Sequence, residues 1–213
     1  GLTGTLERKD GRHVVFRDYF GNHVLKPPKE NFMTPSVDIV PSEVRFLDGR
    51  NMPWASKVNH LCYNQEYVRS VSMIAAAYAA QGHKVLVVSN RVYFLKVCAQ
   101  LVGDNAIHVT GDMDHAEREE TIKQLKKDKN VLFGTQSIFS EGISINELSC
   151  IVLATPINNE PLLTQLIGRI IRKEEGKLQP KVVDIHLKGK TASRQNQARL
   201  GYYKKQGYEV TQL

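Results

Sequence analysis

Hydrophobic and polar residues follow two patterns along this chain, and the two patterns alternate. Short apolar runs rich in β-branched residues predict strands that are covered on both faces. Longer segments in which apolar residues recur every three or four positions predict helices with one buried face. The predicted strands are residues 84–89, 106–110, 130–135, 150–155, 181–187 and 208–212. The predicted helices are residues 64–81, 91–101, 114–127, 159–172 and 193–205.

This alternation predicts an α/β fold for residues 57–213, with a mostly parallel, doubly wound sheet flanked by helices. Ligands of such sheets usually bind at the carboxyl ends of the strands. Residues 1–56 differ, because prolines interrupt regular structure along the segment. We expect an irregular connector that packs only partly on the later domain, with candidate edge strands at Val37–Val40 and Val44–Leu47. Since the first residue is not Met, we expect the chain to be part of a longer protein.

Composition narrows the class of partner. The 213 residues carry a net charge of +7 and a sequence pI of about 9.3, which favours a polyanion, nucleic acid first. Cys62, Cys98 and Cys150 are too few and too far apart for a disulfide framework or a structural zinc site. We therefore expect reduced thiols in an intracellular protein, cytoplasmic or nucleoid-associated, or nuclear in a eukaryote. The longest apolar runs are too short for a membrane span. Trp54 and the eight tyrosines form no evident base-stacking cluster in the sequence.

The predicted helix 159–172 carries the most informative pattern in the chain. Its apolar residues fall on one side, while Gln165, Arg169 and Arg172 fall on the other at spacings of four and three. Gly168 lies beside them and leaves room for a close approach. Because the planar guanidinium fits phosphate oxygens, two such groups can clamp a transferring phosphoryl group. The alternative is a solvated helix face that carries two arginines.

Two further segments leave predicted strands and carry polar side chains. Residues 135–144 form a polar loop in which Thr135 and Ser137 offer hydroxyls and Gly142 permits a close approach. The alternative is a plain connection between two elements. Residues 89–91, Ser-Asn-Arg, open a helix, and helix-start N–H groups beside an arginine can bind an anion. The alternative is simple N-capping by Ser89 or Asn90.

One tempting segment is excluded as a nucleotide loop. Gly189-Lys190-Thr191 resembles the end of a phosphate-binding loop, but that loop needs another glycine five positions before Gly189. Asp184 occupies that position and lies in a predicted strand.

Together these segments resemble the C-terminal RecA-like domain of superfamily 2 helicases. Gln165–Arg172 resembles motif VI, Thr135–Ser144 motif V, Val85–Arg91 motif IV and Leu2–Thr5 motif III of that family. Residues 1–11 and 139–146 are most similar to the UvsW and XPB branch, which comprises double-stranded-DNA translocases, branch-migration enzymes and repair helicases.

The resemblance implies roles for these residues. Arg169 and Arg172 would be arginine fingers that face the γ-phosphate of ATP, supported by Gln165. The nucleotide side of the cleft would be lined by Glu141, Gly142, Ser144 and Gly168. The nucleic-acid backbone would be contacted by Thr135, Gln136, Ser137, Ser89, Asn90 and Arg91. ATP use would be coupled to strand movement by Thr3, Gly4 and Thr5. Many relatives carry Asp where this chain has Ser144, which puts a ribose or metal-linked contact there in doubt.

The resemblance also implies what this chain does not supply. A Walker A loop and an Asp-Glu-x-Asp/His box do not occur in the sequence, and in the family both lie on the N-terminal RecA-like domain. ATP and Mg²⁺ would be held mainly by that domain of the same polypeptide, so we expect this chain alone to be inactive and to hold no metal. The leading hypothesis is the C-terminal motor domain of an ATP-dependent DNA helicase or translocase. The alternatives are a non-catalytic nucleic-acid or partner-binding module, and half of an RNA helicase.

Overall fold

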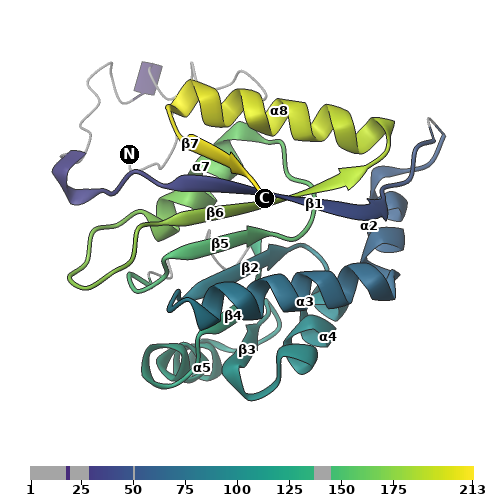
Figure 1. Ribbon diagram of the computed structural model, residues 1–213. Coiled ribbons are helices and arrows are strands. Elements are labelled where there is room, and N and C mark those ends of the chain that lie inside the picture. The colour runs from purple at the N-terminus through teal and green to yellow at the C-terminus, as the bar shows by residue number, and fades with distance from the viewer. Residues whose placement is uncertain (1–17, 20–28, 50, 137–144) are drawn as a thin grey trace.

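Seven strands form one sheet in the order β3-β4-β2-β5-β6-β1-β7, and every neighbouring pair is parallel (Figure 1). This computed structural model describes residues 18–19, 29–49, 51–136 and 145–213. The strands are β1 (Ser36–Arg45), β2 (Val85–Ser89), β3 (Ala106–Val109), β4 (Val131–Thr135), β5 (Cys150–Leu153), β6 (Lys181–Lys188) and β7 (Glu209–Gln212). The described helices are η1 (Lys29–Asn31), α2 (Trp54–Tyr63), α3 (Gln65–Ala80), α4 (Val92–Val102), η2 (Gly103–Asn105), α5 (His115–Lys127), α7 (Glu160–Ile170) and α8 (Lys190–Gln206).

Two apolar layers hold the helices on the sheet, one on each face. Along β2, Val85 and Val87 join the layer formed with α2, α3 and α4, whereas Leu86 and Val88 join the layer formed with α5, α7 and α8. Successive strand residues point to opposite faces, so a continuous run of apolar residues fills both layers. The predicted α/β class, with helices on both faces of a doubly wound parallel sheet, is confirmed.

Three predicted helix starts are fixed by side chains. The side chain of Asn64 accepts a hydrogen bond from the backbone N–H of Tyr67 at 2.9 Å, and that of Asp114 accepts one from Glu117 at 2.7 Å. Asn159 caps α7 at 3.3 Å. Each cap satisfies a backbone donor that the first helical turn leaves without a partner.

The strand prediction for residues 36–47 is wrong in number and in position. These residues form a single strand, β1, that lies between β6 and β7 rather than at an edge. The Asp38 carboxylate anchors it by accepting hydrogen bonds from the Tyr78 hydroxyl at 2.6 Å and the Lys181 ammonium at 2.8 Å. A register shift after Pro41 accommodates the missing N–H of that residue. Strands from before and after residue 56 therefore belong to one sheet. The division of the chain into two domains at this residue stays a prediction.

Helix α2 was also missed by the sequence analysis, since it lies partly in the expected connector. Val58 and Leu61 bury their side chains against the core, and Phe46 contacts Trp54 with ring centroids 5.3 Å apart. The pattern was obscured because this helix has only ten residues and follows directly on an irregular, proline-containing segment. Residues 51–63 thus belong to the same packed unit as the strands.

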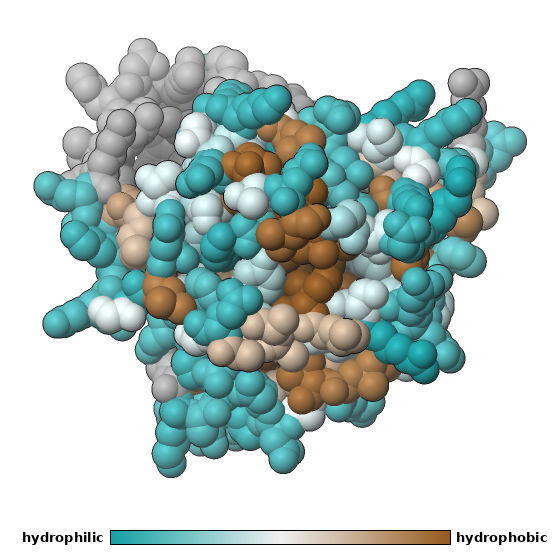
Figure 2. All heavy atoms as spheres, viewed as in Figure 1, coloured by the Kyte–Doolittle hydropathy of each residue, from teal (hydrophilic) through white to brown (hydrophobic). Residues whose placement is uncertain are grey.

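The surface shows polar and apolar regions, and the cysteines are buried. Figure 2 shows hydrophilic residues around the rim of one face and an apolar band across its middle. Cys62, Cys98 and Cys150 are buried free thiols, which agrees with the expected absence of a disulfide framework. Within the described ranges, no helix has both the length and the apolar composition that crossing a bilayer requires.

Candidate functional site

The carboxyl ends of β2 and β4 bring two predicted nucleic-acid residues together. Ser89 ends β2 and Thr135 ends β4, and the two are register partners in the sheet. Both side chains are buried beneath this edge, while Asn90 is exposed and Gln136 half-exposed just beyond it. Strand pairing therefore places the described parts of two predicted segments, residues 89–90 and 135–136, side by side.

Arg91 links two helices through hydrogen bonds that the sequence did not predict. Its guanidinium donates hydrogen bonds to the Asn59 side chain and to the carbonyls of Ala55 at 3.3 Å and Asn90 at 3.2 Å. These contacts fasten α2 to the start of α4. Arg91 itself occupies the N-cap position without a side-chain cap, so the capping predicted for Ser89 or Asn90 is wrong. Ser89 instead accepts the backbone N–H of Arg91 at 3.2 Å, which shapes the turn.

Helix α7 separates into an apolar and a polar side as predicted. Leu163, Leu166, Ile167 and Ile170 are at most 1% exposed, whereas Gln165 is exposed and Arg169 is half-buried. A Cβ atom built on Gly168 would meet no atom of the described residues within 4 Å. Packing among these residues therefore does not require glycine at position 168, and the space that they leave beside it is open.

Arg172 is not on this helix, and the predicted end of the helix is wrong. Helix α7 stops at Ile170, with Ile171 as its C-cap. Arg172 instead forms an antiparallel β-bridge with Phe32, flanked by hydrogen bonds from Met33 N–H to the Ile171 carbonyl at 2.7 Å and from Lys173 N–H to the Asn31 carbonyl at 3.0 Å. The helix ends here because residues 31–33, which precede β1, form hydrogen bonds with the backbone of residues 171–173 in place of helical hydrogen bonds.

Two residues that the sequence analysis did not single out position Arg172. The Lys177 ammonium donates to the carbonyls of Arg172 at 2.8 Å and Asn146 at 2.7 Å. The Arg172 guanidinium approaches the Asn146 side-chain oxygen at 3.4 Å. Burial lowers the pKa of Lys177 to about 8, an effect that the nearby carboxylates of Glu174 and Glu147 oppose. No sequence signal links Lys177 to Asn146, since β5 and α7 lie between them in the chain.

The two arginines still share one electrostatic environment. Burial, and after it the positive charge of Arg172, lowers the pKa of the Arg169 guanidinium. Two like charges held near one another raise the free energy of the site, and a bound polyanion would lower it. Arg169 thus lies in the last turn of α7 and Arg172 on the bridge that follows it, and the convergence of their guanidiniums on one ligand stays a prediction.

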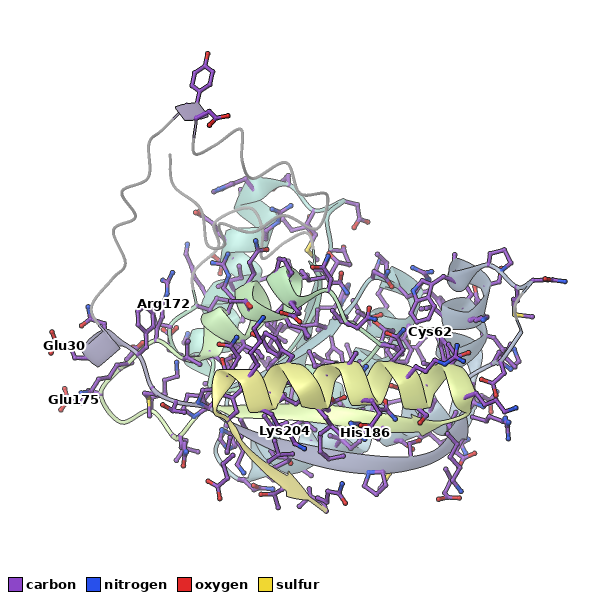
Figure 3. The ribbon with its side chains drawn as sticks, turned by 90° about the horizontal axis from the view of Figure 1, so that it is seen from above. Glu30, Cys62, Arg172, Glu175, His186 and Lys204 are labelled. Carbon is purple, nitrogen blue, oxygen red and sulfur yellow. The ribbon has the colours of Figure 1, made fainter. Side chains whose placement is uncertain are left out.

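The arginines lie at the opposite end of the strands from Ser89 and Thr135. Arg172 pairs with a residue that precedes β1, and Lys84 and Ser149, which precede β2 and β5, line a pocket with Lys177. Figure 3 shows Arg172 beside Glu30 and Glu175 at one end of the molecule and Cys62 at the other. A crossover helix runs back along the strand it follows, so its last turn reaches the amino ends. Of the two predicted groups, only Ser89 and Thr135 lie at the carboxyl ends of the strands, where ligands were expected, and the arginines do not.

Several predicted residues lie outside the described ranges. They are Thr3, Gly4, Thr5, Ser137, Glu141, Gly142 and Ser144.

The excluded Gly-Lys-Thr segment serves the fold. The Asp48 carboxylate accepts the backbone N–H groups of Lys190 at 3.1 Å and Thr191 at 2.7 Å, and these bonds hold the pKa of Asp48 far below its usual value. The acceptor explains why α8 begins at Lys190, three residues before the predicted start. Since a carboxylate already occupies these amides, they are not available to a phosphate.

Comparison with known proteins gives one family. The helicase conserved C-terminal domain family matches residues 67–174. The "Probable helicase D10" of Escherichia phage T5 is 38% identical over 214 aligned residues, which cover 99% of this chain and 48% of that protein. The chain spans about half or less of the length of the curated relatives it matches.

Solved structures show the same fold at low sequence identity. The crystal structure of T4 UvsW superposes with a TM-score of 0.66 at 17% identity, over 83% of this chain and 40% of that one. Dbp5 of S. cerevisiae, as the L327V variant bound to RNA and ADP–BeF3, superposes with a TM-score of 0.64 at 12% identity, over 94% of this chain and 48% of that one.

Proposed function

The chain belongs to the helicase conserved C-terminal domain family, and from that premise we propose that it is the C-terminal motor half of an ATP-dependent DNA helicase or translocase. An N-terminal RecA-like domain of the same polypeptide would hold Mg²⁺ and the phosphates of ATP. This chain would supply two arginines and part of the nucleic-acid track.

The shared site of Arg169 and Arg172 carries the proposal. Each guanidinium offers several N–H donors in a plane, which suits the oxygens of a phosphoryl group. Arg169 is held by the last turn of α7, and Arg172 is held by the bridge to Phe32 and by Lys177. Because the backbone that carries both arginines is held in place without a ligand, their charge could stabilise negative charge that develops during phosphoryl transfer. The donor set thus fits a triphosphate presented by another domain.

The separation of the two groups supports coupling between ATP and nucleic acid. Ser89 and Thr135 lie at the carboxyl ends of their strands, whereas Arg169 and Arg172 lie near the amino ends. A ligand at one end therefore does not compete with a ligand at the other. Closure of the two domains on ATP would move the whole rigid sheet, and with it the nucleic-acid edge.

DNA is our first choice of substrate, since the resemblance of residues 1–11 and 139–146 is to the UvsW and XPB branch. RNA is the second candidate, because the Dbp5 structure that shares this fold is bound to RNA. Both substrates share the backbone-tracking mode.

The test uses the polypeptide that joins this chain to an N-terminal RecA-like domain. We expect Arg169→Ala and Arg172→Ala to leave ATP affinity within a few-fold and to lower nucleic-acid-stimulated turnover by about 10³-fold or more. Arg194→Ala, at an exposed arginine of α8, serves as the matched control and should keep full turnover. Unchanged turnover in both arginine variants would refute the role and favour the non-catalytic module. Stimulation by duplex DNA, single-stranded DNA and RNA, measured in parallel, decides the substrate.

A further inference from the structure

Two exposed tyrosines from different helices contact each other. Tyr63 is the last residue of α2, and Tyr93 is in the first turn of α4. Their ring centroids are 5.7 Å apart and the ring planes are tilted by 42°. The two residues are 69% and 62% exposed, so the rings touch without being buried. The sequence predicted no such cluster, because α2 was not recognised as a helix.

The tyrosine pair lies at the carboxyl edge of the sheet, next to a predicted nucleic-acid segment. Tyr93 is the second residue of α4, whose N-cap is Arg91, so it follows the 89–91 segment directly. Tyr63 lies one turn beyond Asn59, the residue that holds the Arg91 guanidinium. Figure 1 shows α2 at the end to which the strand arrows point. The two rings therefore adjoin the Ser-Asn-Arg corner formed by residues 89–91.

The helices that carry the two rings are complementary in charge to a polyanion. Neither α2 nor α4 contains Asp or Glu, whereas α4 carries the half-buried Lys96 and α2 carries the exposed His60. The first turn of α4 has no acidic residue to offset the positive end of its helix dipole. An exposed aromatic surface on two helices that contain no Asp or Glu suits a nucleic-acid strand, which combines phosphates with aromatic bases.

We propose that Tyr63 and Tyr93 form a stacking surface for an unpaired base of a nucleic-acid strand whose phosphates pass residues 89–91. The proposal rests on the proposed function, which brings nucleic acid to this edge. Because the two rings already contact each other, the base stacks on an outer ring face rather than between them. A base inside a duplex has both faces covered by its neighbours, so the surface selects a single strand or a frayed end.

The experiment compares two probes by fluorescence anisotropy with the 213-residue chain. One probe is a short oligothymidine, and the other is an abasic strand of equal length and charge. We expect Tyr63→Ala and Tyr93→Ala each to weaken binding of oligothymidine by about tenfold and to leave binding of the abasic strand unchanged. Tyr63→Phe and Tyr93→Phe keep the ring and should keep the affinity. Leu101→Ala removes another exposed apolar side chain of α4, at its far end, and is the matched control.

The outcomes separate the two proposals. Tighter binding of oligothymidine than of the abasic strand, lost only in the alanine variants, supports stacking. Unchanged oligothymidine affinity in both alanine variants, or equal losses on both probes, overturns stacking and leaves backbone binding in place. If the wild-type chain binds neither strand at low salt, nucleic-acid binding at this edge is itself refuted. Thermal unfolding of each variant verifies that the fold is intact, as expected for substitutions at exposed positions.

Discussion

Ser89 and Thr135 are register partners at the carboxyl ends of β2 and β4, although β3 and the helices α4, η2 and α5 separate them in the sequence. Both side chains are buried, at 0% and 7% exposure, directly beneath the edge where Asn90 and Gln136 are accessible. Parallel pairing thus builds one polar edge from two loops, and the tyrosine pair of α2 and α4 extends it.

Removal of the Thr135 hydroxyl should weaken nucleic-acid binding with little effect on the fold. Thr135→Val keeps the shape of the side chain and removes one hydrogen-bonding group, which costs about 1 kcal/mol of stability. We expect a loss of roughly tenfold in affinity for a DNA strand, measured by anisotropy at low salt. Thr121→Val, which removes a hydroxyl bonded only within α5, is the control. Equal affinities for the two variants would remove Thr135 from the interface.

An alanine at position 168 should stabilise the protein and impair its turnover. A Cβ there meets nothing within 4 Å, and Gly168 lies inside a helix, so Gly168→Ala should add about 0.5–1 kcal/mol of unfolding free energy. ATP turnover in the two-domain protein should fall if the open space beside Gly168 admits a ligand. Gly201→Ala in α8 also meets nothing within 4 Å. It should give the same gain in denaturant unfolding without a loss of turnover, and equal turnover in the two variants would contradict the assignment.

The glycine that joins β6 to α8 should be intolerant of substitution for a different reason. Gly189 has φ of +115°, and a Cβ there would lie 2.7 Å from the Phe46 carbonyl oxygen. Strain and steric overlap together should cost Gly189→Ala about 2–4 kcal/mol in urea unfolding. Gly103→Ala isolates the strain, since φ is +78° there and nothing lies within 4 Å. Equal losses in the two variants would show that the contact with Phe46 is unimportant.

The buried ion pair between Asp184 of β6 and Arg199 of α8 should make the free energy of unfolding fall at low pH. The Asp184 carboxylate accepts hydrogen bonds from the Arg199 guanidinium at 2.8 Å and the Tyr203 hydroxyl at 3.0 Å. Burial raises the pKa of Asp184, but the charge of Arg199 and the hydrogen bonds from His186 and Arg199 together outweigh burial and hold the pKa below its usual value. In the unfolded chain the Asp184 carboxyl has a pKa of about 4. The ion pair therefore stabilises the fold fully above that pH, and this stabilisation is lost as the pH falls through the lower pKa of the folded state.

Asp184→Asn tests the pair directly. The variant leaves the buried Arg199 charge without its counterion and should lose about 3–5 kcal/mol at pH 7. Its stability should also vary less than that of the wild type in acid, as followed by unfolding at a series of pH values. Asp104→Asn, at an exposed position, should follow the wild-type profile. A parallel loss of stability with acid in Asp184→Asn and the wild type would exclude the pair as the cause.

Most of the strands and helices were predictable because their periodicity reports local burial. The run Val85–Ser89 is buried at every position, and the predicted helices 64–81 and 114–127 begin at their first residues, Asn64 and Asp114, which cap them. The candidate site was predictable only in part. The apolar side of α7 and the exposure of Gln165 followed from spacing, but the end of α7 did not, since it depends on a bridge to Phe32.

By itself the sequence determined the alternation of strands and helices, the buried face of α7 and the residues that resemble a helicase motor, because each depends on the order of neighbouring residues. Only the tertiary structure decided that β1 lies inside the sheet, that Arg172 leaves the helix to pair with Phe32, and that Tyr63 contacts Tyr93. These features join distant segments through backbone pairing and side-chain contact. Their free energy arises only when the sheet brings both partners together, so no local pattern records it.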